Sequence, residues 1–276
     1  MYPTLVEFGP LKLHAYGFML AVSFFFGILL AARRAPARRI PADVVFDTAL
    51  VIVFASILGS RLMYVFFHME EVHSFLDVVA VWRGGLTMYG GVLAAMAAAG
   101  LYVRRRKVPF LRLADVMAPS LGLGLMLTRL GCFLNGCCYG KPTDSALGVQ
   151  FPVETLVGRV FEESALHPTQ LYSAATGLFI LGLLLLLDRG RRPEGQLFAL
   201  YLMLDGIGRF ALDFFRYYEA NVYVLGELTV NQLISIGLFL LGVLLLVYTR
   251  QMPSARVPGW SAASHGGQPV PARSAR

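Results

Sequence analysis

Three arginines interrupt stretches of sequence that are otherwise apolar. Arg61 lies in "ILGSRLMYVFFH", Arg129 in "MLTRLGCF" and Arg209 in "GIGRFALDFF". A charge at membrane depth costs at least about 2.5–3.5 kcal/mol on insertion scales, so such a residue needs a partner and commonly marks a functional site. One interpretation is structural pairing, for example of Arg209 with Asp213 one helical turn later. Because three guanidinium groups at similar depth are many, we favour a shared anionic ligand, and guanidinium binds lipid phosphate bidentately.

Further polar residues lie at the predicted starts of helices. "HPTQLYSA" places His167 and Gln170 around Pro168, which suits the first turn of a helix. His167 could be a structural hydrogen-bonding residue or, close to arginines, a general base. "WRGGLTMYGG" places Tyr89 between two glycine pairs, which could present backbone amides to a headgroup or allow close helix packing. Tyr89 itself could face the bundle or anchor the helix at the membrane interface.

The chain has three cysteines, which follow the spacing C-x4-CC at Cys132, Cys137 and Cys138. Three interpretations remain open for them: small buried side chains, a disulfide that involves Cys132, and a metal or catalytic site. Zinc sites usually add a second cysteine pair or histidines, and the sequence has no second cluster of this kind. We therefore expect no metal ion at these residues.

The elements that must position these residues are apolar runs. Of the 276 residues, 57% are hydrophobic and 15% are charged, against about 45–50% and about 25% in soluble domains. Seven runs reach or approach the roughly 20 residues that a helix needs to cross the hydrocarbon core. They cover residues 13–32, 44–67, 86–103, 110–131, 170–187, 196–215 and 230–248. Because helices satisfy their own backbone polar groups, the sequence predicts an all-α, polytopic membrane protein with seven transmembrane helices.

The basic residues predict the orientation of these helices. Four basic clusters, in residues 33–39, 104–112, 189–192 and 250–276, follow the first, third, fifth and seventh runs. With seven spans all four clusters fall on one side, which the positive-inside rule makes cytoplasmic. The N-terminus then lies outside and the C-terminus in the cytoplasm. The net charge of +7 is therefore a topology signal, and we expect no nucleic-acid partner.

The two ends of the chain differ in character. The N-terminal residues lack a basic region and an evident cleavage site, so we expect the first run to be a retained helix. Residues 251–276 are rich in Pro, Ser, Ala, Gly and Arg, which predicts a disordered cytoplasmic tail. The expected organisation is one membrane domain over residues 1–250 and a tail over residues 251–276. No internal repeat is evident, although many secondary transporters have one.

Seven segments, in order, resemble the signature of a known family. They are "HAYGFMLA", "GSRLMYVFF", "WRGGLTMYGG", "RLGCFLNGCCYG", "HPTQLYSA", "GRFALDFFR" and "ELTVNQLIS". Their order and spacing over residues 11–250 resemble the bacterial prolipoprotein diacylglyceryl transferases. The resemblance implies an enzyme of the bacterial cytoplasmic (inner) membrane, with its active site toward the outer leaflet. It would transfer a diacylglyceryl group from phosphatidylglycerol to the lipobox cysteine thiol of a prolipoprotein signal peptide, with glycerol phosphate as the other product.

The resemblance also implies roles for particular residues. It assigns essential arginines and other signature positions to Arg129, Arg209, Tyr16, Asn135, Gly140 and Asp213. We expect Arg61 and Gln170 to add to the binding of substrate. No cofactor is expected, because a lipid phosphate held by arginines is already an adequate leaving group.

The chain departs from the best-known members at several signature positions. Their usual residues are replaced by Tyr89 (for His), Cys132 and Cys137 (for Asn and Glu), Ser173 (for Glu) and Asp205 (for Tyr). The identity of the general base therefore stays open. The candidates are His167, whose unperturbed pKa is about 6.5, then Tyr89 and Asp213.

Other classes of function remain open at this stage. A divergent member could act on another lipid or acceptor. A channel or transporter could use the three arginines to bind an anionic solute, and a lipid-binding scaffold could keep the fold without catalysis.

Overall fold

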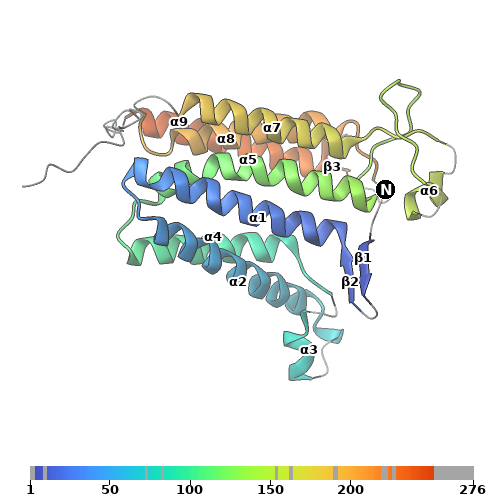
Figure 1. Ribbon diagram of the computed structural model, residues 1–276, viewed down its shortest axis with the longest axis horizontal. Helices are drawn as coiled ribbons and strands as arrows, with labels where there is room; N and C mark the ends of the chain where they lie inside the picture. Colours follow the sequence, from blue (N-terminus) through green and yellow to red (C-terminus); the bar gives the residue numbers. More distant parts are fainter. Residues whose placement is uncertain are drawn as a thin grey trace, which may run out of the picture.

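Long helices packed side by side make up most of the computed structural model (Figure 1). It describes residues 4–8, 11–71, 74–81, 84–152, 155–161, 164–188, 192–218, 223–225 and 228–251. A helix occupies each of the seven predicted runs, which confirms that part of the sequence analysis. These helices are α1 (Ala15–Arg34), α2 (Ala42–Phe67), α4 (Met88–Arg105), α5 (Phe110–Asn135), α7 (Thr169–Leu187), α8 (Gln196–Asp213) and α9 (Val230–Arg250).

Five of the described helices are long and apolar enough to cross a membrane. They are α1 together with the 3-10 turn η1 (Ala35–Arg38), α2, α5, α7 and α9. The other two have 18 residues each. Helix α4 is rich in Gly and Ala, whereas α8 carries Asp205, Arg209 and Asp213. The chain is therefore a multi-pass helical membrane protein, while the total of seven spans stays a prediction.

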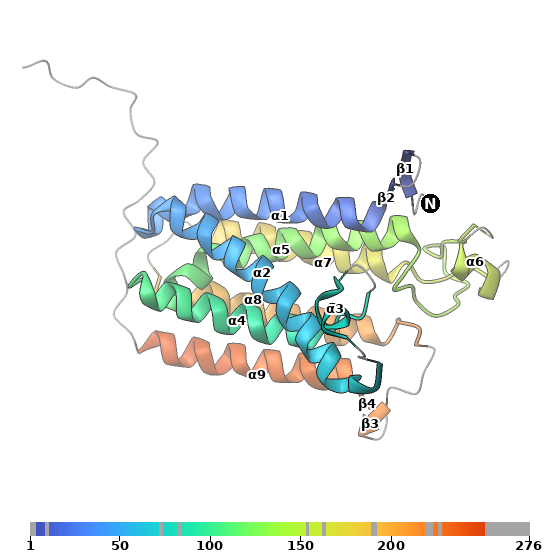
Figure 2. The ribbon, with the colours of Figure 1, turned by 90° about the horizontal axis from the view of Figure 1, so that it is seen from below.

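Helix α5 lies at the centre of the bundle. It packs against α1, α7 and α8, while α8 packs against α9 and α2 packs against α4 (Figures 1 and 2). Glycines allow the closest approaches: a Cβ added to Gly177 on α7 would lie 2.7 Å from the backbone N of Met126 on α5. In the same way, a Cβ on Gly90 would lie 2.4 Å from the carbonyl oxygen of Gly59 on α2. The second glycine pair of "WRGGLTMYGG" thus serves helix packing.

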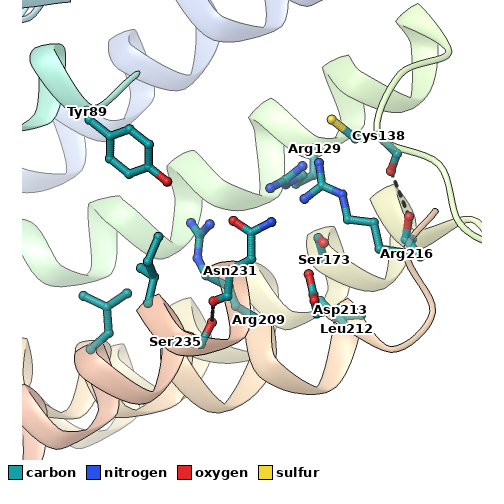
Figure 3. A pocket seen from close by; sticks show the side chains of 13 residues that line it. Tyr89, Arg129, Cys138, Ser173, Arg209, Leu212, Asp213, Arg216, Asn231 and Ser235 are labelled. Atoms are coloured by element: carbon teal, nitrogen blue, oxygen red, sulfur yellow. Dashed lines mark hydrogen bonds between the residues drawn. The ribbon is translucent and has the colours of Figure 1, made fainter. Parts of the chain in front are cut away.

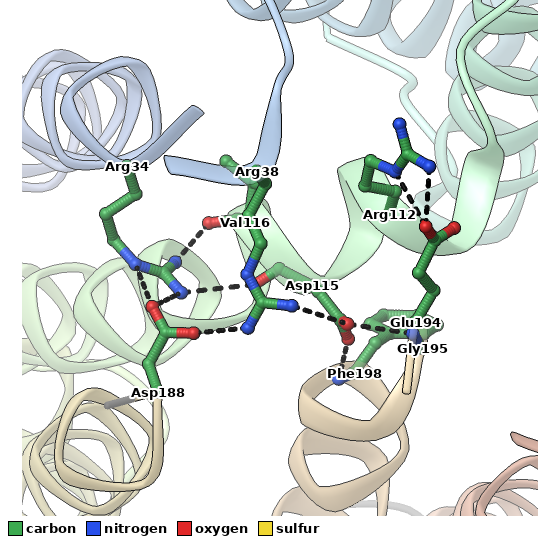
Figure 4. Close-up of polar contacts among 9 residues, drawn as sticks. All are labelled: Arg34, Arg38, Arg112, Asp115, Val116, Asp188, Glu194, Gly195 and Phe198. Carbon is green, nitrogen blue, oxygen red and sulfur yellow. Dashed lines mark hydrogen bonds and ion pairs between the residues drawn. The ribbon is translucent and has the colours of Figure 1, made fainter. Parts of the chain in front are cut away.

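A network of charged residues ties the helices together at one end of the bundle (Figure 4). Arg34 and Arg38 both bind Asp188 at the end of α7, at 2.7 and 2.5 Å. The fully buried Asp115 on α5 accepts a hydrogen bond of 2.8 Å from the backbone N–H of Gly195, the residue before α8. Residues that the sequence analysis used only as signals of orientation therefore also hold the helix ends in place.

Small elements gather at the opposite end of the bundle (Figures 1 and 2). They are the antiparallel pairs β1 (Thr4–Phe8) with β2 (Leu11–His14) and β3 (Tyr223–Leu225) with β4 (Leu228–Thr229), and the short helices η2 (Met69–Glu71), α3 (Phe75–Val79) and α6 (Leu156–Phe161). The two small sheets lie outside the long helices, and the fold agrees with the all-α class that the sequence predicts. The predicted tail lies outside the described residues, apart from Gln251.

Candidate active site

A pocket lies where α5 and α8 end and where α4, α7 and α9 begin (Figure 3). Its volume is about 690 Å³ with the open mouth included. The polar part of its lining consists of Tyr89, Arg129, Cys138, Thr169, Ser173, Arg209, Asp213, Arg216, Asn231 and Ser235. The pocket thus unites side chains from five helices and the loops that join them.

Three guanidinium groups face this pocket, from Arg129 on α5, Arg209 on α8 and Arg216 just after α8. The Nε of Arg209 donates to Oδ2 of the buried Asp205 at 2.7 Å. Among the described residues, neither Arg129 nor Arg216 forms an ion pair with a carboxylate, and the guanidinium carbon of Arg216 lies 5.4 Å from the centre of the Tyr218 ring. The predicted meeting of Arg129 and Arg209 is therefore confirmed, and the pocket carries positive charge that suits an anion.

Arg61 does not join the other arginines, which corrects the expectation of a shared ligand. Its guanidinium is buried and donates to the backbone carbonyls of Val78 (3.1 Å), Gly84 (2.7 Å), Gly85 (3.1 Å) and Asp77. The two glycines have φ of 83° and 68°, a region in which residues other than glycine are uncommon. Arg61 and the first glycine pair therefore fix the segment between α2 and α4, away from the pocket.

Asp213 does not pair with Arg209, contrary to the i, i+4 interpretation. Its two oxygens accept hydrogen bonds from the hydroxyls of Tyr218 and Thr229. The Tyr218 hydroxyl in turn accepts from Nδ2 of Asn231 at 2.7 Å. Burial, together with the hydrogen bond to Asp213, raises the pKa of Tyr218 to about 12. Asp213 therefore joins the end of α8 to the start of α9 and sets the position of Asn231, an arrangement that does not favour it as a base.

His167 and Gly140 meet beside the pocket, and neither belongs to its lining. The backbone N–H of Gly140 donates to the carbonyl of His167 at 2.9 Å, and a Cβ on Gly140 would lie 2.6 Å from that of His167. The Nδ1 of His167 is 3.3 Å from the hydroxyl of Tyr172, and its ring packs edge-on against Phe215. Gly140 thus permits a close backbone contact, and His167 as the base stays a prediction that the pocket geometry does not favour.

The three cysteines converge at the end of α5. Gly136, with a φ of 74°, ends the helix and turns the chain back, so that the Sγ atoms of Cys132, Cys137 and Cys138 all lie within 4.8 Å of one another. All three are free thiols, so the disulfide interpretation has no support. Only Cys138 belongs to the lining of the pocket.

The environment of Cys138 favours its thiolate. Hydrogen bonds from the thiols of Cys132 and Cys137, together with the positive charges of Arg216 and Arg129, lower the pKa of this thiol. The thiolate is the reactive and metal-binding form of cysteine.

Three other predicted residues lie next to the pocket and outside its lining. Gln170 is fully buried and donates from Nε2 to the carbonyl of Cys137 at 2.8 Å. The side chain of Asn135 contacts the Cys137 thiol, and Tyr16 lies within electrostatic range of Arg129 and the cysteines. Gln170 and Asn135 support the turn around Cys137. The contact of all three residues with substrate stays a prediction.

Sequence reasoning missed Arg216 and Asn231 among the residues that line the pocket. A signal for Arg216 was present, because it follows Arg209 by seven residues, the spacing at which two residues share one face of a helix. Asn231 lies in the segment "ELTVNQLIS" of the family resemblance, but one amide side chain near the start of a helix is common and did not mark it as a site residue.

The fold and the site together define a multi-pass helical membrane protein with a positively charged pocket at one end of its bundle. The family model for prolipoprotein diacylglyceryl transferases matches residues 3–248. The chain belongs to this family.

Curated relatives agree over nearly the whole length. The chain is 34% identical over 273 residues to a protein of Synechococcus elongatus, with 95% of this chain and 93% of the relative covered. It is 36% identical over 253 residues to a protein of Geobacter sulfurreducens, with 89% and 94% covered. It is 30% identical over 244 residues to a protein of Clostridium tetani, with 88% and 96% covered. All three relatives are named phosphatidylglycerol–prolipoprotein diacylglyceryl transferase.

Proposed function

We propose that this chain is an enzyme that transfers a diacylglyceryl group from phosphatidylglycerol to prolipoproteins. The observation that carries the proposal is the meeting of Arg129, Arg209 and Arg216 in one pocket of a membrane-embedded helical bundle. A phospholipid headgroup is the anion most available to such a pocket. The names of the relatives supply the two substrates, a phosphatidylglycerol and a prolipoprotein.

The acceptor in this proposal is the thiol of the lipobox cysteine in the prolipoprotein signal peptide. Its sulfur attacks the glyceryl carbon, the bond from this carbon to the phosphate oxygen breaks, and a thioether and glycerol phosphate result. The departing phosphate gains negative charge as the bond breaks. Guanidinium groups held in a fixed arrangement can stabilise this charge more in the transition state than in the ground state, which is the condition for catalysis.

The three arginines have different roles in the proposal. Arg129 and Arg216, which lack a carboxylate partner among the described residues, bind the phosphate directly. Arg209 faces the same pocket from its ion pair with Asp205, which fixes its orientation. Asp213 is a positioning residue, because it acts through Tyr218 and Thr229.

The proposed orientation places the pocket toward the outer leaflet of the bacterial cytoplasmic membrane. The pocket lies at the opposite end of the bundle from Arg34, Arg38 and Arg112. The positive-inside rule assigns such basic residues to the cytoplasmic side. A signal peptide with its cysteine near the outer surface would then meet the headgroup in the pocket.

The test is a direct transfer assay with the full-length purified protein. The protein is reconstituted with phosphatidylglycerol and a lipobox peptide, and mass spectrometry detects the diacylglyceryl adduct. We expect Arg129→Ala to lower the rate at least about a hundredfold, the usual effect of removing one such donor. Arg106→Ala is the matched control, because Arg106 follows the far end of α4 and pairs with Asp43 and Asp47.

Two outcomes would contradict the proposal. One is normal turnover by Arg129→Ala at equal membrane abundance. The other is the absence of an adduct with the unaltered protein, in which case anion flux into liposomes would identify a transporter, and binding of phosphatidylglycerol alone would identify a scaffold.

A further inference from the structure

The three thiols form a compact set of metal ligands at the edge of the pocket. Their Sγ atoms lie within 4.8 Å of one another. A Zn²⁺ ion bound at Zn–S distances of about 2.3 Å in a tetrahedral arrangement holds its sulfurs about 3.8 Å apart. The thiols of Cys132, Cys137 and Cys138 thus need to approach one another by at most about 1 Å to share one ion.

The turn that carries two of these thiols is held from outside. Cys138 has a φ of 63°, a conformation in which residues other than glycine are uncommon. The buried Thr169 donates from Oγ1 to the carbonyl of Cys138, and the buried Gln170 donates from Nε2 to that of Cys137, both at 2.8 Å. These two hydrogen bonds hold the turn in place before any ion binds, which is the kind of support that a preorganised ligand set needs.

The position of the cluster connects it to the phosphate site. Cys138 lines the same pocket as Arg129 and Arg216 (Figure 3). Catalytic zinc sites have three protein ligands and keep a fourth position for water or substrate, whereas structural sites have four protein ligands. The chain has three cysteines, and among the described residues no other histidine, cysteine or carboxylate belongs to this cluster.

We propose that Cys132, Cys137 and Cys138 bind a Zn²⁺ ion whose fourth position takes the acceptor thiol of the prolipoprotein. This inference rests on the proposed function and assigns the deprotonation of that thiol, the step for which the sequence offered only His167, Tyr89 and Asp213 as candidate bases. It revises the expectation of no metal, which followed from the lack of a second cysteine or histidine cluster. A site that reserves one position for a substrate thiol needs no fourth ligand from the protein.

The chemistry balances without an oxidant or a reductant. The acceptor thiol loses its proton to water when its sulfur binds Zn²⁺, because a coordinating thiol is deprotonated. The zinc-bound thiolate then attacks the glyceryl carbon, the carbon–sulfur bond forms, and the electron pair of the carbon–oxygen bond leaves on the phosphate. The neutral thioether is a weak ligand, so the product leaves the ion and water takes its place.

The charges near the cluster favour this arrangement. Three thiolates and one Zn²⁺ carry a net charge of −1, and a bound substrate thiolate makes it −2. Arg129 and Arg216 offset this charge, since both act electrostatically on Cys138. The same two guanidinium groups would then face the phosphate on one side and the thiolate centre on the other.

The experiment measures metal binding by the full-length protein, independently of transfer. The purified protein is loaded with Zn²⁺ or with Co²⁺ as a spectroscopic probe, with the thiols reduced. We expect one tightly held ion per chain, and thiolate-to-cobalt charge transfer with the strong visible bands of tetrahedral Co²⁺. Addition of a lipobox peptide should shift the visible bands, whereas the same peptide with serine in place of its cysteine should leave them unchanged.

Variants separate this inference from the proposed function. Cys132→Ser and Cys138→Ser should no longer bind the ion, and their transfer rate should fall at least about a hundredfold. Arg209→Ala should lose transfer activity but still bind the ion with an unchanged spectrum.

The zinc inference is overturned if the reduced protein binds no ion, if the isolated protein contains a disulfide between two of the cysteines, or if the cysteine peptide leaves the cobalt spectrum unchanged. Full transfer by metal-free protein would overturn the zinc inference and leave the proposed function intact. Zinc binding with the expected peptide response but no adduct would overturn the proposed function instead.

Discussion

The guanidinium of Arg216 is the cationic group of the pocket that the sequence analysis did not name as a site residue, although it ends the segment "GRFALDFFR". It lines the pocket without a carboxylate partner among the described residues, whereas Arg209 shares its charge with Asp205. We expect Arg216→Ala to lower kcat/KM for phosphatidylglycerol about a hundredfold or more, because it removes a donor aimed at the departing phosphate. Arg216→Lys should recover only part of this loss, since an ammonium group keeps the charge and loses the planar fork.

The adduct assay measures both Arg216 variants at equal protein abundance. Arg216→Ala with the kinetics of the unaltered protein would contradict a role in binding phosphate. Arg216→Lys with full activity would instead show that a positive charge suffices and that the fork is not used.

At the scale of residues, the sequence could predict that the intramembrane arginines have partners, and not which partners. Arg61 and Arg129 give the same signal, a charge within an apolar run. Arg61 donates to four backbone carbonyls, two of which belong to glycines with positive φ, whereas Arg129 faces an open pocket. The energetic cost of burying a charge is local in the sequence, whereas its compensation comes from a segment whose path depends on the whole fold.

At the scale of elements, Asp115 is the residue on which the junction of α5 and α8 depends. It is fully buried, and its oxygens accept from the backbone N–H groups of Gly195 (2.8 Å) and Phe198 (2.9 Å). We expect Asp115→Ala to lower the free energy of unfolding by about 2–3 kcal/mol, because two buried donors at the start of a helix lose their acceptor. The thermal unfolding midpoint in detergent micelles measures this effect.

Glu194→Gln is the matched control for this prediction. Its ion pair with Arg112, at 2.6 Å, lies at the same end of the bundle and is partly exposed to solvent. We expect a loss below about 1 kcal/mol, as for other exposed pairs. If both variants lost the same free energy of unfolding, stability would depend on any change of charge at this end of the bundle. The hydrogen bonds that Asp115 accepts from the start of α8 would then have no special role.

The helices themselves were predictable from the sequence, because a long apolar run has few alternatives to a helix in lipid. The strand pairs β1–β2 and β3–β4 were not, because strands of two to five residues outside the apolar runs carry no clear period. The polar network was not predicted either. Arg34 and Arg38 were interpreted only by their sign, and their bonds to Asp188 depend on helix ends that are distant in the sequence.

At the scale of the whole molecule, the directions of the helices favour seven crossings. Helices α7 and α9 are apolar enough to span and both begin at the pocket, where Ser173 and Asn231 line it. The chain must therefore return to the pocket end between them, and α8 is the element that does so, with Arg209 near its end (Figure 1). Helix α4 makes the opposite crossing between α2 and α5, because it begins at the pocket with Tyr89 and ends with Arg105 in a basic cluster. Helix α8 is polar because it contributes Arg209 to the pocket and also Asp205, which forms an ion pair with Arg209.

Reporter insertions on either side of α8 test this topology. Alkaline phosphatase is active only outside the cytoplasm, so we expect activity when it is inserted after Tyr218 and none when it is inserted after Arg192. A fluorescent protein that matures only in the cytoplasm should give the reverse pattern. If both insertions reported the same compartment, α8 would not cross the membrane. The pocket and the basic helix ends could then not lie on opposite sides of the membrane, as we propose. The opposite pattern of activity would place the pocket inside, away from any secreted acceptor, and would leave the arginines without the substrate that we propose for them.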